Sequence, residues 1–165
     1  MSFLSGPMLA LILVVLATNT PAHSAEPPAL QRITVCERPI QAEVASTLAQ
    51  QRQGLMHRSR LKPDHGMLFA YDREEVRAFW MKNVPMDLDI GFFDSNKKLV
   101  HWLTMKGTLK DPHAVPTPDA ELPQYSSQKP FRYAVELRAG FFRNLEAPGG
   151  LKRCTLSLES TPEIR

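Results

Sequence analysis

The chain has 165 residues, of which 43% are hydrophobic, and this length and composition allow one domain of ordinary size with its own core. Its 20 lysines and arginines are interleaved with 17 acidic residues, which leaves a net charge of +3 and no Lys/Arg run. Nucleic-acid binding requires clustered positive charge, so we expect no nucleic-acid partner.

The first 25 residues predict an export signal. Met8 to Ala17 is a nearly unbroken apolar run, and no Asp, Glu, Lys or Arg precedes Glu26. The run is too short to span a bilayer comfortably, and small residues around Ala22 to Ala25 are typical of a cleavage site. We therefore expect an exported protein, periplasmic or secreted. It would contact the membrane only through residues 1–25, and only if that signal is left uncleaved.

The mature chain should consist of a linker at residues 26–31 and one β-rich domain at residues 32–160. Arg32 to Cys36 and Ile40 to Ala45 predict two strands joined by a tight turn. Thr47 to Gln50 matches a capping box, which predicts a short helix that ends at Gly54. Three apolar residues of this segment are expected to face the core: Leu48, Leu55 and Met56.

Short apolar or alternating runs follow one another along the rest of the chain without regular helices between them. The expected strands are Met67 to Ala70, Ala78 to Met81, Leu88 to Phe93, Leu99 to Met105, Phe131 to Leu137 and Arg153 to Leu158. A charged connection is expected at Tyr71 to Arg77, a Pro-rich loop at residues 107–129 and a short helix within Ala139 to Leu145. This order predicts an α+β, predominantly β fold: a compact antiparallel curled sheet or small barrel with one or two short helices.

The chain contains two cysteines, Cys36 and Cys154, one near each end of the expected domain. An even pair in an oxidising compartment favours a disulfide, which here would tie the first strand to the last. The alternative is a pair of buried thiols. The spacing fits neither a CxxC redox motif nor a zinc site.

The stretch from Gly66 to Asp94 holds three apolar clusters, with polar residues trapped between the second and the third. Such polar groups must find partners or a ligand. The predicted binding site comprises Arg58, Trp80, Lys82, Asn83, Asp87 and Asp89. Lys82 would take an anionic group and Trp80 would offer an apolar face.

A structural alternative exists for the same residues. Asp89 and Asn83 could satisfy backbone groups at a buried turn, while Lys82 neutralises a carboxylate. Arg58 could form a structural ion pair with a carboxylate such as Asp89 or Glu136, the latter lying inside an apolar strand.

The leading functional hypothesis is an exported accessory or ligand-binding protein without catalysis or cofactor, whose partner is a small ligand or an envelope protein. The sequence shows no GxSxG motif, no phosphate-cradling loop and no catalytic setting for a cysteine. One alternative is an envelope-acting hydrolase with Asp87 or Asp89 as acid or base. Another is copper binding through methionine and histidine, with His101, Met105, Met81 and Met86 as candidate ligands. Methionines in apolar runs can equally be core filler.

An ordered set of motifs carries a family resemblance. The segments are Gln51-Arg52-Gln53-Gly54-Leu55-Met56 with Arg58, Gly66-Met67-Leu68-Phe69, Phe79-Trp80-Met81-Lys82-Asn83, Leu88-Asp89-Ile90 with Phe93-Asp94, and Tyr133-Ala134-Val135-Glu136-Leu137 with Gly140. Over about residues 32–158 the chain resembles the domain of unknown function 192 family. The resemblance implies a compact, mostly β fold with a helix at the Gly-Leu-Met segment, and it implies no established activity.

The chain departs from the family pattern at two places. The family usually has proline at the position of Asp87, so a carboxylate there adds a charge to the candidate site. The common Gly-Asp near the C-terminus is replaced around Gly149-Gly150, where no Asp follows.

Overall fold

A computed structural model describes residues 27–108, 117–145 and 151–164 of the chain. The predicted export signal, residues 1–25, lies outside the described residues, as do residues 109–116 of the predicted Pro-rich loop. Within the described ranges, no helix is long and apolar enough to cross a membrane.

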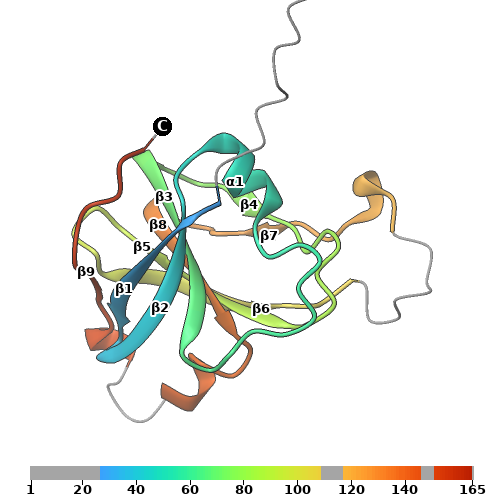
Figure 1. Cartoon of the computed structure of the whole chain (residues 1–165). Coiled ribbons are helices and arrows are strands. Elements are labelled where there is room, and N and C mark those ends of the chain that lie inside the picture. The colour runs from blue at the N-terminus through green and yellow to red at the C-terminus, as the bar shows by residue number, and fades with distance from the viewer. Residues whose placement is uncertain (1–26, 109–116, 146–150, 165) are drawn as a thin grey trace, which may run out of the picture.

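Seven strands of the described residues form one curled sheet in the order β6-β5-β8-β3-β2-β1-β9 (Figure 1). Their bounds are β1 Ala29–Val35, β2 Arg38–Ala45, β3 His65–Glu75, β5 Leu88–Phe93, β6 Leu99–Met105, β8 Phe131–Arg138 and β9 Leu156–Leu158. Neighbouring strands are antiparallel except β2 and β3, because α1 (Leu48–Gln53) and the loop after it carry the chain back before β3 begins. The predicted fold class is confirmed.

The two edges of the sheet meet at one end. Lys98, just before β6, forms an isolated bridge with Thr155, just before β9. The Leu156 amide also donates to the Lys97 carbonyl at 2.9 Å. The predicted disulfide between Cys36 and Cys154 is formed beside this junction, and it joins the β1–β2 turn to the approach to β9.

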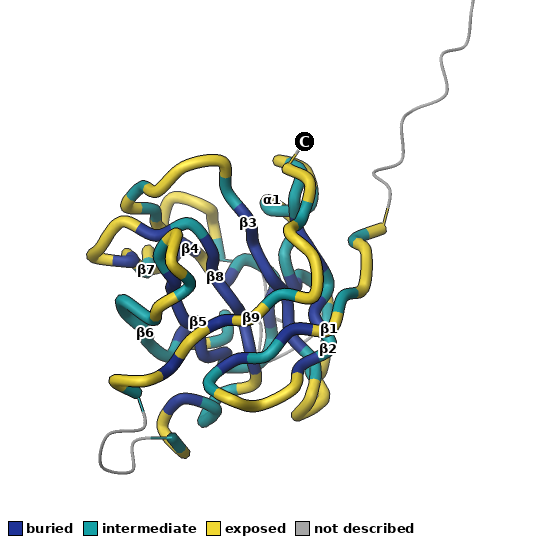
Figure 2. The backbone as a smooth tube through the Cα atoms, turned by 90° about the vertical axis from the view of Figure 1, so that its left-hand side faces the viewer, coloured by how far each residue is buried: buried dark blue, intermediate teal, exposed yellow. Residues whose placement is uncertain are grey.

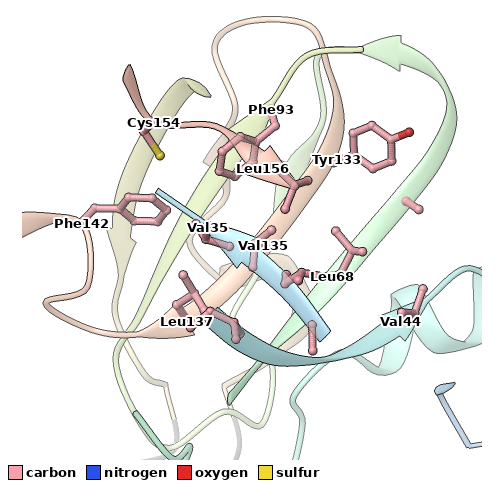
Figure 3. Close-up of a cluster of buried hydrophobic side chains, with 14 residues drawn as sticks. Val35, Val44, Leu68, Phe93, Tyr133, Val135, Leu137, Phe142, Cys154 and Leu156 are labelled. Carbon is pink, nitrogen blue, oxygen red and sulfur yellow. The ribbon is translucent and has the colours of Figure 1, made fainter. Parts of the chain in front are cut away.

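Side chains alternate between two apolar clusters on the two faces of the sheet. On β3, Leu68 and Ala70 enter one cluster, whereas Met67 and Phe69 enter the other. The inner cluster lies within the curl, where side chains from β1, β2 and β9 meet those from β5 and β8 (Figure 3). The outer cluster is covered by the segments that follow α1 and β4 (Ala78–Phe79). Strands β3, β5 and β8 are buried along much of their length because they carry both clusters (Figure 2).

Several predicted boundaries differ from the structure. Strand β1 begins at Ala29, inside the expected linker. Strand β3 continues to Glu75 through the segment predicted as a charged connection, because Glu75 pairs with Phe131 beyond a bulge. β4 has only two residues, and it pairs with β7 (Tyr125–Ser126), which lies in the predicted loop together with the 3-10 helix η1 (Asp119–Glu121).

Two further expectations near helices are corrected. Leu48 opens α1 on its solvent side and is 59% exposed, whereas Leu55, beyond the helix, is buried as predicted. The expected helix at Ala139 to Leu145 is reduced to the 3-10 turn η2 (Arg143–Leu145). A further 3-10 turn, η3 (Leu151–Arg153), takes up the first residue of the strand expected from Arg153 to Leu158, and β9 begins only at Leu156.

Candidate functional site

A cavity of about 310 Å³ lies on the outer face of the sheet. It opens between the segment around the end of α1 and the segment that follows β3, at the end of the sheet where α1, β4 and β7 gather (Figure 1). Its lining combines aromatic, basic and amide side chains with one carboxyl: Gln51, Arg52, Gln53, Gly54, Leu55, Met56, Phe69, Tyr71, Arg77, Ala78, Phe79, Trp80, Lys82, Val84, Gln124 and Glu136. The size suits a small-molecule site.

Local capping fixes the wall formed by α1. The Thr47 hydroxyl accepts a hydrogen bond from the Gln50 amide, and the Gln50 side chain accepts one from the Thr47 amide, which completes the predicted capping box. Gly54 ends the helix at a positive φ of 47°. Gln51 Nε2 donates to the Ala70 carbonyl at 3.0 Å, which attaches the helix to β3. Local capping therefore shapes this wall, and one longer-range hydrogen bond attaches it to the sheet.

The opposite wall is the Phe79 to Val84 segment. Phe79 is buried against Phe69 with ring centroids 5.4 Å apart, whereas Trp80 is 37% exposed at the mouth. Asn83 turns the chain at a positive φ of 53°, and its carbonyl accepts a hydrogen bond from the His57 amide at 2.8 Å. This contact joins the two walls of the cavity directly.

The basic side chains at the cavity are held by neighbours. Lys82 Nζ lies 2.6 Å from Asp119 Oδ2 and 5.9 Å from the centre of the Trp80 ring. Arg77 donates to Glu75 at 2.9 Å, and its guanidinium lies over the Tyr71 ring at 4.2 Å. Two of the three basic side chains in the lining therefore already have an anionic partner.

Glu136 is the one carboxyl of the described cavity lining. It lies on β8 directly across from Met67 on β3 and Ile90 on β5, and only 5% of its surface is exposed. No side chain or backbone group of the described residues hydrogen-bonds to it. Burial raises the pKa of Glu136 to about 8, because the charged form loses its hydration. The pKa of nearby Tyr71 is likewise raised by burial, to about 12.

Asp89, the predicted candidate acid, lies on the other face of the same strands. It is completely buried, and its carboxylate accepts hydrogen bonds from the Thr104 hydroxyl at 2.8 Å and from the Gly140 and Phe142 amides at 3.1 Å each. Gly91 admits the Phe142 ring beside it, since an added Cβ would lie 2.3 Å from Phe142 Cζ. These contacts make Asp89 an anchor for the turn after β8, as the structural alternative proposes.

The remaining predicted residues are also separate from the cavity. Asp87 accepts from Lys106 Nζ at 2.8 Å and from the Gly107 amide at 2.9 Å. Arg58 makes a two-pronged ion pair with Glu43, with Nη2 and Oε2 2.6 Å apart, so its partner is neither of the two carboxylates named as examples from the sequence, Asp89 and Glu136. Of the six predicted residues, only Trp80 and Lys82 line the cavity.

The methionines proposed as copper ligands lie in the core. Met81 and Met105 are completely buried in the outer cluster, and Met86 packs against it. The His101 ring stacks on Phe92, with ring centroids 6.1 Å apart. The structure describes no group of three or more His, Cys, Asp or Glu side chains able to hold a metal ion. This arrangement favours the core-filling alternative for these methionines.

Glu136 is the functional candidate that sequence reasoning placed wrongly. Its position within an apolar run is visible in the sequence, but from the sequence it is only one possible ion-pair partner of Arg58 and not a predicted site residue. The available signal is the strand alternation: Ala134 belongs to the outer cluster, so Glu136, two residues on, must face the same buried side. A carboxyl on a buried face requires a partner, and the sequence alone does not show whether the fold provides one.

Comparison with known proteins gives a family and a fold. A solved structure of a candidate transcription regulator from Sinorhizobium meliloti has 28% sequence identity and a TM-score of 0.60, covering 79% of this chain and 95% of that one. A protein of unknown function from Novosphingobium aromaticivorans has 21% identity and a TM-score of 0.59, covering 87% and 99%, and it supports the fold alone. Among curated proteins, none matches the chain.

The family model described as "Uncharacterized ACR" matches residues 31–152, and this range contains both walls of the cavity and its floor. The motif resemblance and the model agree over almost the same residues. The chain belongs to the DUF192 family.

Proposed function

We propose that this protein is an exported binding protein that holds a small molecule in the cavity between the end of α1 and the Phe79 to Val84 segment. The observation that carries the proposal is the burial of the Glu136 carboxyl beside the cavity without a hydrogen-bond partner among the described residues. A buried carboxyl without a hydrogen bond from the described residues costs free energy, and here it borders a cavity of about 310 Å³. A ligand that pairs with it would recover that cost.

The walls support binding because hydrogen bonds within the protein hold both of them in place. The capping box, the Gln51 contact to β3 and the His57–Asn83 hydrogen bond fix both sides of the cavity. Preorganised walls reduce the entropy lost on binding. Trp80 and Phe79 contribute aromatic surface of the kind that lines small-molecule sites.

The hydrolase alternative receives little support from the candidate carboxylates. The Asp89 carboxylate accepts hydrogen bonds from three donors, and the Asp87 carboxylate accepts from Lys106 Nζ and the Gly107 amide. Neither lines the cavity. The Sinorhizobium relative is described as a candidate transcription regulator, but the basic residues of this chain are interleaved with acidic ones and lack the clustering that nucleic-acid binding requires.

Export rests on the predicted signal and on the disulfide, because disulfides persist mainly in oxidising compartments. Cell fractionation combined with mass spectrometry of the mature N-terminus tests it. We expect the protein in the periplasm or medium with a new N-terminus near residue 25. Recovery in the cytoplasm with residues 1–25 intact would contradict export.

Thermal unfolding of the oxidised protein against a panel of amines, sugars, nucleotides, amino acids and metal ions tests ligand binding. A ligand at 100 times its dissociation constant adds about 2.7 kcal/mol, which raises the midpoint by several degrees. Trp80→Ala should abolish the shift, whereas Leu48→Ala removes an exposed apolar side chain outside the cavity and should keep it. No shift with any compound would contradict a small-molecule site.

A further inference from the structure

The charge balance around the cavity distinguishes possible ligands. Lys82 is paired with Asp119, and Arg77 shares the Glu75 carboxylate with Arg73, so both lining cations already have an anionic partner, although Arg77 Nε is buried without a hydrogen bond. Arg52, the third cation of the lining, is exposed at the end of α1. Glu136 is different, since it lies at the buried side of the cavity and no described residue offers it a hydrogen bond or a positive charge at contact distance. Glu136 is therefore the one carboxyl of the described lining without a partner, and its ionised form would gain one from a cationic ligand.

The aromatic side chains that line the cavity also favour a positively charged ligand. Tyr71, Phe79, Phe69 and Trp80 all line the cavity, and the faces of aromatic rings attract cations. Arg77 already uses the Tyr71 ring in this way, with its guanidinium 4.2 Å from the ring centre. An anion entering the cavity would meet both the aromatic faces and the Glu136 carboxyl. An ammonium group would find favourable interactions with both.

We infer that the cavity binds a small organic ammonium ion, whose charged group pairs with the Glu136 carboxylate while its apolar part packs against Phe79 and Trp80. This inference rests on the proposed function and specifies the ligand class for that same site. It differs from the sequence-based expectation of an anion bound at Lys82, because Lys82 already forms an ion pair with Asp119.

Binding of such a cation is coupled to proton release. In the free protein Glu136 is mainly protonated at pH 7, because burial raises its pKa to about 8. The ammonium ion selects the ionised form, so the affinity should increase as pH rises toward 8. The other ionisable groups that face the cavity are Arg52 from α1, Tyr71 from β3, and Arg77 and Lys82 from the opposite wall. Arginine, lysine and tyrosine ordinarily titrate near or above pH 10, outside this range.

Isothermal titration calorimetry with benzylamine, benzyl alcohol and benzoate tests the inference, since the three probes share a ring and differ in the charge of the head group. Benzylamine should bind most tightly, and its affinity should rise about tenfold from pH 6 to pH 7. Titrations at pH 7 in two buffers of different ionisation enthalpy should show release of nearly one proton. Glu136→Gln should lose the proton release and at least tenfold in affinity.

A matched control is Glu37→Gln, which changes an exposed carboxyl at the β1–β2 turn outside the cavity and should leave benzylamine binding intact. Circular dichroism should show both variants folded. Tighter binding of benzoate or benzyl alcohol, or equal binding of benzylamine by wild type and Glu136→Gln, would overturn the ammonium inference and leave the binding function standing. Failure of all three probes at millimolar concentration would also overturn it. The binding function itself fails only if the unfolding panel shows no shift.

Discussion

Two buried carboxyls lie on opposite faces of the same pair of strands. Asp89 on β5 is in register with Leu137 on β8, and Glu136 on β8 is in register with Ile90 on β5. On the inner face, three donors satisfy Asp89. On the outer face, Glu136 has no donor among the described residues and borders a cavity. The difference separates a carboxyl that holds the fold together from one that is available to a ligand.

The two faces are also closed in different ways. The inner cluster is sealed where the two edges of the sheet meet, beside the disulfide between Cys36 and Cys154. The outer cluster is covered by the segments after α1 and β4, which leave the cavity open between them. We therefore expect changes on the inner face to affect stability and changes at the cavity to affect binding.

Removal of the disulfide should have the largest effect on stability. The bridge links positions 118 residues apart, and on the chain-entropy account its loss costs about 4–5 kcal/mol. Denaturant unfolding of the Cys36→Ser/Cys154→Ser double variant measures this. Benzylamine binding under conditions where the variant stays folded should match that of wild type. A loss of binding without a loss of stability would contradict the division between the two faces.

The pH dependence of stability provides the next test. Burial raises the pKa of Glu136 from 4.5 to about 8, so between these values the folded protein holds a proton that the unfolded chain has released. Stability from this group is therefore present at low pH and falls as pH rises, by about 3–4 kcal/mol from pH 5 to pH 8.

The Glu136→Gln variant is the control, because an amide at this position does not titrate. Urea unfolding at pH 5 and at pH 8 should show a smaller fall for this variant than for wild type. Parallel pH profiles of the two proteins would show that Glu136 is not held neutral by burial.

Replacement of Asp89 should destabilise the fold, because its carboxylate accepts three hydrogen bonds. Asp89→Ala leaves the Gly140 amide and the buried Phe142 amide without an acceptor, and we expect a loss of about 3 kcal/mol at pH 7. Asp87→Ala is a suitable comparison, because that carboxylate is partly exposed and should cost less. Urea unfolding of both variants gives the difference. Equal losses in the free energy of unfolding would mean that the hydrogen bonds of Asp89 stabilise the fold no more than those of Asp87.

The smallest effect is expected from Arg58→Ala. Its pair with Glu43 attaches the segment after α1 to β2, but both side chains are partly exposed, so the loss should be about 1 kcal/mol. Thermal unfolding checks this, with Arg60→Ala as a control for an exposed arginine nearby. A larger loss would show that the Arg58–Glu43 pair contributes more to the stability of the fold than expected for two partly exposed side chains.

The parts of the fold that depend on local sequence were predictable. The capping box at Thr47, the stop at Gly54 and the strands Leu88 to Phe93 and Leu99 to Met105 occur as expected, because each is determined by residues close in the chain. The disulfide was also predictable, since the predicted export signal and an even number of cysteines favour a disulfide.

The arrangement of the site was not predictable, because it depends on contacts between distant segments. Neighbouring positions in a strand face opposite sides, so Asp89 lies on the inner face, whereas Glu136 faces the outer side with Phe79. Arg58 could reach several carboxylates in principle, and only the parallel pairing of β2 with β3 places Glu43 beside it. No local pattern encodes which of these charges remains without a partner.

The most direct test of the account is an NMR titration of the glutamate side-chain carboxyl carbons in the disulfide-bonded protein, with Glu136→Gln to assign the resonance. The account predicts one glutamate that titrates with a midpoint near pH 8, is absent from the variant, and moves to a lower midpoint when benzylamine is added. A Glu136 resonance that titrates near its ordinary value of 4.5 would contradict the account, because the carboxyl would then be hydrated or paired in the free protein.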